Sequence, residues 1–327
     1  MTTLVFVVAP ARLLRLTFWR DYAVTMRPYL LFVSGITGIA GMALAPGASA
    51  WRLATLAVVF FLSYGFGQAL TDCFQLDTDS LSAPYRPLVR GAIRRDDVLA
   101  VSLTGLAISC IVIGAQAPAA LPLCALTVAG LASYTWFKRR WWGGPLWNAW
   151  IVAVVLLIGF VAAGGTALGG APLLGAVAAA LLGYANFVLV GYYKDIPADR
   201  ATGYRTFPVV FGLRRSHVVS DVFMAGAFAG AGATIAALGM ARGPGHVAAG
   251  LAFAAVALVA AVIAQARTHG VTSDRDAYRA IAPGVHAYVL LMAAVAAAAR
   301  PSWAVVLALF YAGFVATLRR RPMAEQI

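Results

Sequence analysis

The sequence predicts an all-α fold, a polytopic transmembrane helical bundle of nine to ten spans. Hydrophobic residues make up 62% of the 327 residues and charged residues only 11%. A water-soluble domain of this length could not cover so much apolar surface. The apolar residues come in runs of about 17–25 residues, the length that a helix needs to cross the hydrocarbon core. The runs lack the polar–apolar alternation of a β-barrel, so the backbone in lipid must form its hydrogen bonds within helices.

Ten apolar segments follow one another along the chain, and we interpret them as the membrane spans of a domain over residues 26–319. In chain order they are residues 28–47, 52–71, 97–115, 118–137, 145–165, 172–193, 216–239, 245–265, 282–299 and 301–318. The last two segments lie close together. Residues 282–318 could therefore form one span and a re-entrant or interfacial piece, which would give nine spans.

Two polar segments flank this domain. Residues 1–25 are predicted to lie on the cytoplasmic membrane surface, because leucines and aromatic residues are interleaved there with Arg12, Arg15 and Arg20. Residues 320–327 are predicted to be a cytoplasmic tail.

The basic residues orient the bundle. If the N-terminus starts on one side, all but three of the 25 Lys and Arg residues fall on that side, and Arg52, Arg242 and Arg300 fall on the other. The positive-inside rule makes the basic side cytoplasmic, in the cell (inner) membrane. A basic C-terminus on that side requires an even number of spans, which favours ten. The net charge of +13 is therefore mostly a topology signal, with attraction to the lipid bilayer surface, and does not indicate nucleic-acid binding.

The acidic residues form two clusters, each after the end of an apolar span on the basic side. If the second span continues as a helix, Asp72, Gln75 and Asp79 lie within about 60° of one another, while Asp77 points about 140° away from Asp72. In the second cluster, Asp195 and Asp199 are one helical turn apart. Two opposed acidic faces could hold Mg²⁺, which takes a few carboxylates and prefers phosphate oxygens for the rest. The alternative is that these are ordinary loop acids paired with neighbouring arginines.

Other site chemistries have little support in the sequence. The three cysteines, Cys73, Cys110 and Cys124, are too widely spaced to suggest a disulfide framework or a zinc site. Asp221 lies inside an apolar span, where a carboxylate is costly. We expect it to pair with a cation such as Arg214 or to help position an acceptor.

The first acidic cluster resembles a motif of the UbiA superfamily of intramembrane prenyltransferases. The family's motif reads Asn-Asp-x-x-Asp-x-x-x-Asp and is followed by Pro-x-Arg-Pro. This chain has Thr71-Asp72-x-x-Gln75-x-x-x-Asp79, followed by Pro84-Tyr85-Arg86-Pro87. Gln75 departs from the family's pattern: it keeps a carbonyl ligand but removes a negative charge.

Two further stretches carry the same resemblance, which covers roughly residues 20–300. The family's second motif reads Asp-x-x-x-Asp-Arg, then Gly and an Arg-Thr or Lys-Thr pair; this chain has Asp195-x-x-x-Asp199-Arg200, Gly203 and Arg205-Thr206. The family also has a Tyr-rich helix end with a Lys-Arg pair and then an Asn in the next helix. The corresponding stretch here runs from Tyr134 to Lys138-Arg139, with Asn148 following.

The resemblance implies an Mg²⁺-dependent transfer of a prenyl group from an isoprenyl diphosphate to a lipophilic or aromatic acceptor, in a central cavity that opens to lipid. It implies metal ligands at Asp72, Asp79, Asp195 and Asp199, with Lys138 as a further catalytic residue. The substrate-binding residues that it suggests are Gln75, Arg86, Tyr134, Asn148, Asn186, Tyr192, Lys194 and Arg205. Tyr64, Phe66, Trp147, Tyr184 and Phe187 join Tyr134 and Tyr192 as aromatic candidates for shielding an allylic cation.

Two other functions remain open. An intramembrane terpene cyclase would use the same Asp clusters without a separate acceptor. A transporter or channel would place acids along the membrane depth to line a cation path, and the concentration of acids at one face argues against it.

Overall fold

The computed structural model describes residues 13–321. The predicted surface segment 1–25 lies partly, and the predicted tail 320–327 mostly, outside the described residues. Within them the chain is helical and has no strand, which confirms the predicted fold class. Nine helices are long and apolar enough to cross a membrane, and the bent pair α2 (Leu16–Met26) and α3 (Leu31–Leu44) makes a tenth if the pair is counted as one span.

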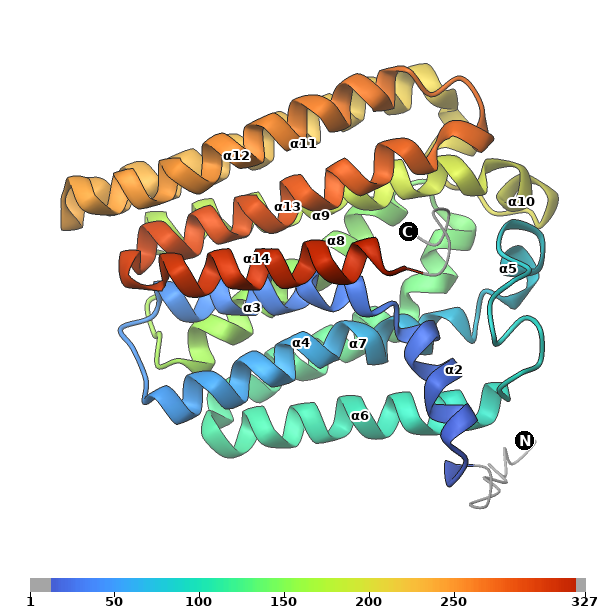
Figure 1. The fold of residues 1–327 in the computed structure, drawn as a ribbon, viewed down its shortest axis with the longest axis horizontal. Helices are drawn as coiled ribbons and strands as arrows, with labels where there is room; N and C mark the ends of the chain where they lie inside the picture. Colours follow the sequence, from blue (N-terminus) through green and yellow to red (C-terminus); the bar gives the residue numbers. More distant parts are fainter. Residues whose placement is uncertain (1–12, 322–327) are drawn as a thin grey trace.

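The long helices run back and forth between the two ends of one bundle (Figure 1). After α3 they are α4 (Ala50–Asp72), α6 (Arg95–Gln116), α7 (Leu121–Arg140), α8 (Gly144–Ala162), α9 (Ala171–Gly191), α11 (Phe207–Arg242), α12 (Pro244–His269), α13 (Tyr278–Ala299) and α14 (Ala304–Arg319). The segments at 282–299 and 301–318 are thus two separate helices. Prolines stand in the first turn of α7, α8, α9, α11 and α12, where the missing N–H breaks no helical hydrogen bond.

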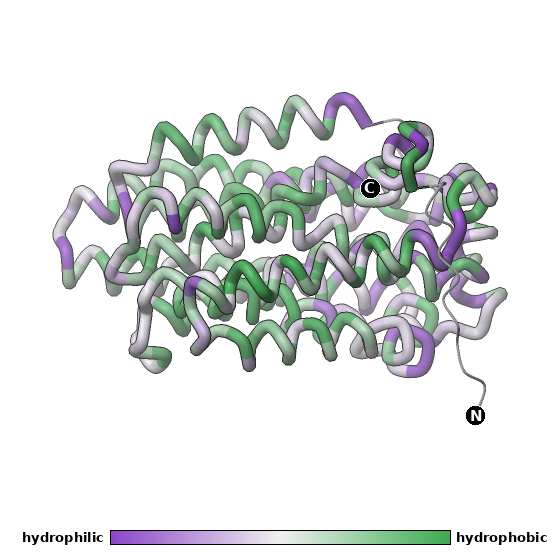
Figure 2. Tube along the Cα trace, turned by 90° about the horizontal axis from the view of Figure 1, so that it is seen from below, coloured by the Kyte–Doolittle hydropathy of each residue, from purple (hydrophilic) through white to green (hydrophobic). Residues whose placement is uncertain are grey.

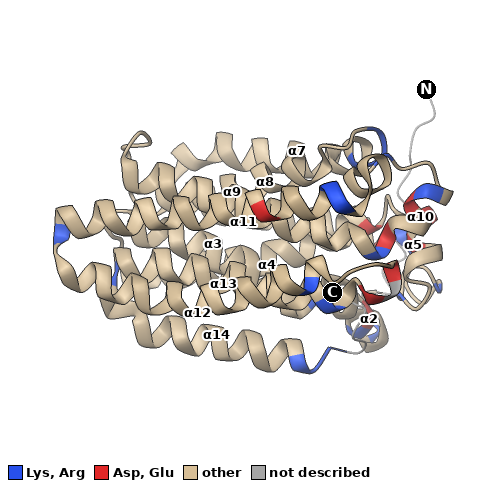
Figure 3. Ribbon diagram, turned by 90° about the horizontal axis from the view of Figure 1, so that it is seen from above, with Lys and Arg blue, Asp and Glu red and all other residues tan. Residues whose placement is uncertain are grey.

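Hydrophilic residues gather at the two ends of the bundle and hydrophobic residues between them (Figure 2). The two short helices α5 (Leu76–Ser82) and α10 (Ile196–Ala201) lie at the end that carries most of the acids (Figure 3); we call it the acidic end. At the opposite end, Arg52, Arg242 and Arg300 each donate to backbone carbonyls at the C-terminal end of a helix or just beyond it. These three cations therefore satisfy carbonyl groups that the helices leave unpaired.

The centre of the bundle is formed by α3, α8, α9 and α13, with α11 and α12 on one side and α4, α6 and α7 on the other (Figure 1). In the half away from the acidic end, α3 and α8 approach backbone to backbone. A Cβ atom on Gly41 would lie 2.0 Å from the backbone oxygen of Leu156, and one on Gly159 would lie 2.3 Å from that of Gly38. Small residues permit this approach, as they do at many helix contacts in membranes. No space for a ligand is left between α3 and α8 at these positions.

Candidate active site

The first acidic cluster lies at a break between two helices. α4 ends at Asp72, Gln75 has φ −122° and ψ 19°, and α5 begins at Leu76. The predicted continuation of the helix is therefore wrong: the N–H groups of Phe74 and Gln75 bond three residues back and tighten the turn, and Arg95 holds the carbonyl of Cys73. The break redirects the chain.

The break still brings the expected side chains together. Asp72, Gln75 and Asp79 are all buried and line one cavity. Asp77 lies outside the cavity, half exposed, and accepts hydrogen bonds from Arg139 and Tyr204. The separation of Asp77 from its three neighbours thus exists in the structure, although it arises from the break and not from the phase of one continuous helix.

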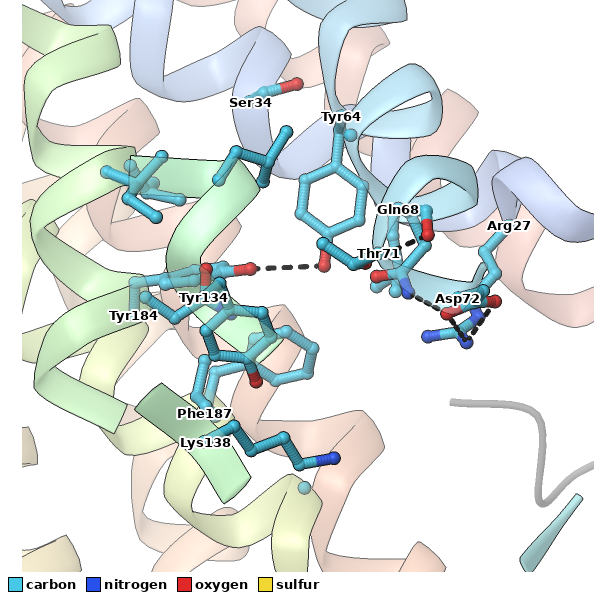
Figure 4. A pocket seen from close by; sticks show the side chains of 18 of the residues that line it. Arg27, Ser34, Tyr64, Gln68, Thr71, Asp72, Tyr134, Lys138, Tyr184 and Phe187 are labelled. Atoms are coloured by element: carbon cyan, nitrogen blue, oxygen red, sulfur yellow. Dashed lines mark hydrogen bonds and ion pairs between the residues drawn. The ribbon is translucent and has the colours of Figure 1, made fainter. Parts of the chain in front are cut away.

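The cavity has a charged mouth at the acidic end and an apolar, aromatic interior, with a volume of about 190 Å³. Figure 4 shows Asp72 and Arg27 on one side and Lys138, Tyr134 and Tyr184 facing them. The charged lining residues are Arg27, Asp72, Asp79, Arg86, Lys138, Lys194 and Asp195. The interior is lined by Tyr64, Leu131, Tyr134, Ile151, Val152, Val155, Tyr184, Phe187, Val188 and Tyr192.

Two arginines hold the carboxylates of the first cluster. Arg27 Nη2 lies 2.9 and 3.1 Å from the two carboxylate oxygens of Asp72, and Gln68 Nε2 lies 2.6 Å from one of them. Arg86 forms an ion pair with Asp79 and lies 3.9 Å from Asp72. Burial raises the pKa of the Asp79 carboxyl, and the guanidinium of Arg86 opposes this rise. The cations beside these two buried carboxylates offset part of the cost of burying them.

Lys138 is buried at the end of α7 and points into the same cavity (Figure 4). Its Nζ donates to Gln75 Oε1 at 2.8 Å and lies 5.1 Å from the ring centre of Tyr192. Gln75 accepts this hydrogen bond without neutralising the ammonium charge. Asp199, Asp195 and Asp79 attract this ammonium from farther away, and it also faces any anion in the cavity.

The second acidic cluster separates its two carboxylates. α9 ends at Gly191, a 3₁₀ turn runs over Tyr192–Asp195, and α10 starts at Ile196. Asp195 lines the cavity. Asp199 is fully buried outside the cavity lining, where it accepts hydrogen bonds from Thr78 at 3.2 Å and Thr206 at 3.0 Å. In this structure Asp199 ties α5 to α10 and the loop after it.

The remaining predicted site residues fall into two groups. Asn148, Tyr134, Tyr192, Lys194 and Arg86 line the cavity, and the hydroxyls of Tyr134 and Tyr192 are 2.8 Å apart. Two others do not reach it. Asn186 is buried against α11 and accepts from Ser220, and Arg205 is exposed, with its backbone N–H bonded to Arg139.

The carboxylate of Asp221 on α11 has its hydrogen-bond partners on the neighbouring helix α12. It accepts from Gln265 at 2.7 Å and pairs with His269 at 2.8 Å, both on α12. The expected pairing with Arg214 is wrong, because α12 packs against this face of α11 and supplies the partners.

Sequence reasoning missed two residues of the site. In the sequence, Arg27 is one of the many cations on the basic side of the membrane, and no motif gives Gln68 a role. Arg27 has φ 53°, the single positive φ at a non-glycine residue in the described part of the chain, and such a conformation costs about 1–2 kcal/mol. Two signals in the sequence point to these residues. Arg27 precedes Pro28 at the start of a span, and Gln68 lies one helical turn before Asp72.

The donor set at the mouth fits a hard divalent cation. Mg²⁺ is usually held by one or two carboxylates together with substrate phosphate oxygens, and the cavity offers Asp72, Asp79 and Asp195 with the amide oxygen of Gln75. Within residues 13–321 no three Asp, Glu, His or Cys side chains already converge as a metal centre. Phosphate oxygens would therefore have to complete the coordination.

The sequence of this chain matches a known protein family and several of its members. The sequence model of the UbiA prenyltransferase family matches residues 34–282. Digeranylgeranylglyceryl phosphate synthase of Halobacterium salinarum is 35% identical over 208 residues, which cover 62% of this chain and 73% of that protein. The corresponding synthase of Natronomonas pharaonis is 30% identical over 201 residues, 61% of this chain and 72% of that protein.

Solved structures share the fold. A UbiA homolog from Aeropyrum pernix superposes with a TM-score of 0.65 at 22% identity, over 79% of this chain and 94% of that one. A UbiA homolog from Archaeoglobus fulgidus, bound to GPP and Mg²⁺, gives a TM-score of 0.64 at 17% identity, over 85% of this chain and 99% of that one.

Proposed function

This chain belongs to the UbiA prenyltransferase family, a family of membrane enzymes. We therefore propose that it transfers a prenyl group from an isoprenyl diphosphate to a lipophilic or aromatic acceptor within the membrane, with Mg²⁺ as cofactor. One observation carries the proposal. A single cavity joins three carboxylates and several cations at its mouth to an aromatic and aliphatic interior. An isoprenyl diphosphate has the same two parts, a charged diphosphate group and an apolar hydrocarbon chain.

The reaction breaks the bond between C1 of the prenyl chain and the diphosphate oxygen, and the electron pair leaves with that oxygen. An acceptor atom forms the new bond to C1, and the acceptor loses a proton. Lys138 and Arg86 stand at the mouth to hold the charge of the departing diphosphate. Mg²⁺ bound by Asp72, Asp79 and Asp195 would neutralise the negative charge that develops there.

The cavity interior suits the electron-poor allylic chain. The faces of Tyr134, Tyr192 and Phe187 can stabilise a cation without reacting with it. These rings and the aliphatic side chains around them also keep water from C1, where it would compete with the acceptor.

Topology and relatives support the choice of compartment and acceptor. The concentration of Lys and Arg at the acidic end supports a cytoplasmic orientation of that end in the cell membrane, where water-soluble isoprenyl diphosphate would enter. The relatives named digeranylgeranylglyceryl phosphate synthases make a prenylated glyceryl phosphate the first acceptor to test, beside an aromatic acid.

The test uses the purified protein in vesicles of phosphatidylglycerol and phosphatidylethanolamine, with geranyl, farnesyl or geranylgeranyl diphosphate and Mg²⁺. We expect diphosphate release that stops on chelation by EDTA, and a product whose mass contains donor and acceptor carbons. A cyclic hydrocarbon formed without acceptor would contradict transfer and support a cyclase. No diphosphate release with any donor and acceptor would contradict the proposed function.

Replacement of Gln75 tests how the missing carboxylate affects metal binding. Gln75→Glu keeps the shape of the side chain and adds a negative charge at the mouth of the cavity. We expect the Mg²⁺ concentration for half-maximal diphosphate release to fall about tenfold, because charges a few ångströms apart in a buried site interact strongly. The matched control is Gln116→Glu at the opposite end of the bundle, and an Mg²⁺ requirement that stays constant or rises in Gln75→Glu would contradict a metal at this mouth.

A further inference from the structure

A pair of tyrosines crosses the inner part of the cavity, which Ser34, Thr127 and Val155 also line. Tyr64 on α4 and Tyr184 on α9 point toward each other across the cavity (Figure 4), and their hydroxyls are 3.2 Å apart. Neither helix contributes a lining residue much deeper than this pair: Ser63 is the deepest on α4, and Tyr184 itself is the deepest on α9. A buried hydroxyl among apolar groups needs a partner, so the hydrogen bond holds the two rings as a bar across the cavity.

The space behind the bar is filled. The ring of Tyr288 on α13 lies 5.9 Å from that of Tyr184, and the Tyr288 hydroxyl bonds to Thr37 on α3 at 2.7 Å. The next residue on α3 is Gly38, where a Cβ atom would lie only 2.3 Å from the ring of Phe60. On the side of α3 and α13, a hydrocarbon chain that reaches the tyrosine pair therefore meets packed side chains.

The depth of the cavity can be read from the two helices that carry the pair. Tyr64 lies eight residues before Asp72 on α4, and Tyr184 lies eight residues before Tyr192 near the end of α9. At 1.5 Å per residue, both place the bar about 12 Å from the carboxylate mouth. Three backbone bonds of an extended chain span about 3.5 Å, so the four main-chain bonds of one isoprene unit span roughly 4.5 Å. The distance holds about two to three isoprene units.

We propose that the Tyr64–Tyr184 pair is the floor of the prenyl-chain channel and that it limits the preferred donor to an isoprenyl diphosphate of two or three isoprene units. This rests on the proposed function, because it concerns the donor of the same site. Truncation of Tyr184 would open space up to the Tyr288 ring, since a packed bundle refills such a gap only in part. The opened space would admit about one further isoprene unit.

Binding of donor analogues tests the floor without requiring turnover. Isoprenyl S-thiolodiphosphates with two, three and four isoprene units would be titrated against the full chain in vesicles, with Mg²⁺ present. The readout is the ratio of the Kd for four units to the Kd for two units within each variant, so that a loss of active protein cancels. For the wild-type protein we expect a ratio of at least about ten, because a hydrophobic pocket discriminates by that factor on small differences in size. Tyr184→Ala and Tyr64→Ala should each bring the ratio to about one.

Two control variants separate size from other effects. Tyr184→Phe keeps the ring and should keep the high ratio. Tyr311→Ala removes a tyrosine outside the cavity that pairs with His286, and should also keep it. A ratio that is the same in the wild type and in both alanine variants would overturn the floor while leaving prenyl transfer standing. A wild-type protein that binds none of the analogues would instead defeat the proposed function.

Discussion

Asp72→Asn should abolish nearly all prenyl transfer, with a loss of about 10³-fold in kcat/KM for the isoprenyl diphosphate. Asp72 is 3% exposed and stands at the mouth of the cavity, between Arg27 and Arg86. Asparagine has the same shape but lacks the charge that would hold a divalent cation against the diphosphate. Release of diphosphate, followed with a coupled pyrophosphatase in vesicles, measures the effect.

Asp77→Asn is the matched control for this loss, because Asp77 lies on α5, is half exposed and faces away from the cavity. It should retain activity within about twofold to threefold, since an exposed ion pair is worth little. The melting temperatures of both variants in detergent should be compared, because the asparagine also leaves Arg27 without its charged partner. A folded Asp72→Asn protein with activity within tenfold of the wild type would remove Asp72 from the proposed metal site.

Lys138→Met is expected to lower kcat about 10²-fold, with a smaller change in KM. Methionine fills a similar volume without charge. The ammonium of Lys138 is held in the cavity by Gln75 and stands beside the rings of Tyr192 and Tyr204. Charge accumulates on the diphosphate as the C1–O bond breaks, so a cation aimed at it acts mainly on the transition state. Steady-state kinetics of diphosphate release over a range of donor concentrations separate kcat from KM.

Arg140→Met supplies the comparison for Lys138→Met, because Arg140 is an exposed cation two residues further along the same helix end. It should leave both constants close to those of the wild type. If Lys138→Met raised KM and left kcat unchanged, Lys138 would contribute uniform binding and no stabilisation of the departing diphosphate.

The membrane spans follow closely from the sequence. Segments 52–71 and 145–165 correspond to α4 (Ala50–Asp72) and α8 (Gly144–Ala162), because the thickness of the hydrocarbon core sets the length of an apolar helix. The segment at 216–239 is the exception, since α11 already begins at Phe207 and bends at Gly212, which has φ 76°. Arg214 and Arg215 interrupt the apolar run there, but a helix that leaves the membrane can continue without apolar residues.

The composition of the site was predictable only in part. The spacing of the acids and the resemblance to the prenyltransferases pointed to Asp72, Asp79, Asp195 and Lys138, and all four line the cavity. The same reasoning assigned Asn186 and Arg205 to substrate, although one bonds to α11 and the other is exposed. Polar residues near a motif are close to it in sequence, but packing against other helices decides where each side chain points.

A helical membrane bundle with its acids and most of its cations at one end follows from the amino-acid sequence, because lipid excludes unpaired backbone groups and charge alike. Which of these charges meet depends on how the helices pack. The breaks after Asp72 and Gly191 turn Asp79 and Asp195 toward one cavity and leave Asp77 and Asp199 outside it. A non-helical turn of a few residues redirects everything after it, and contacts with distant helices stabilise that turn. The pairing of Arg27 with Asp72, 45 residues apart in the chain, has the same origin.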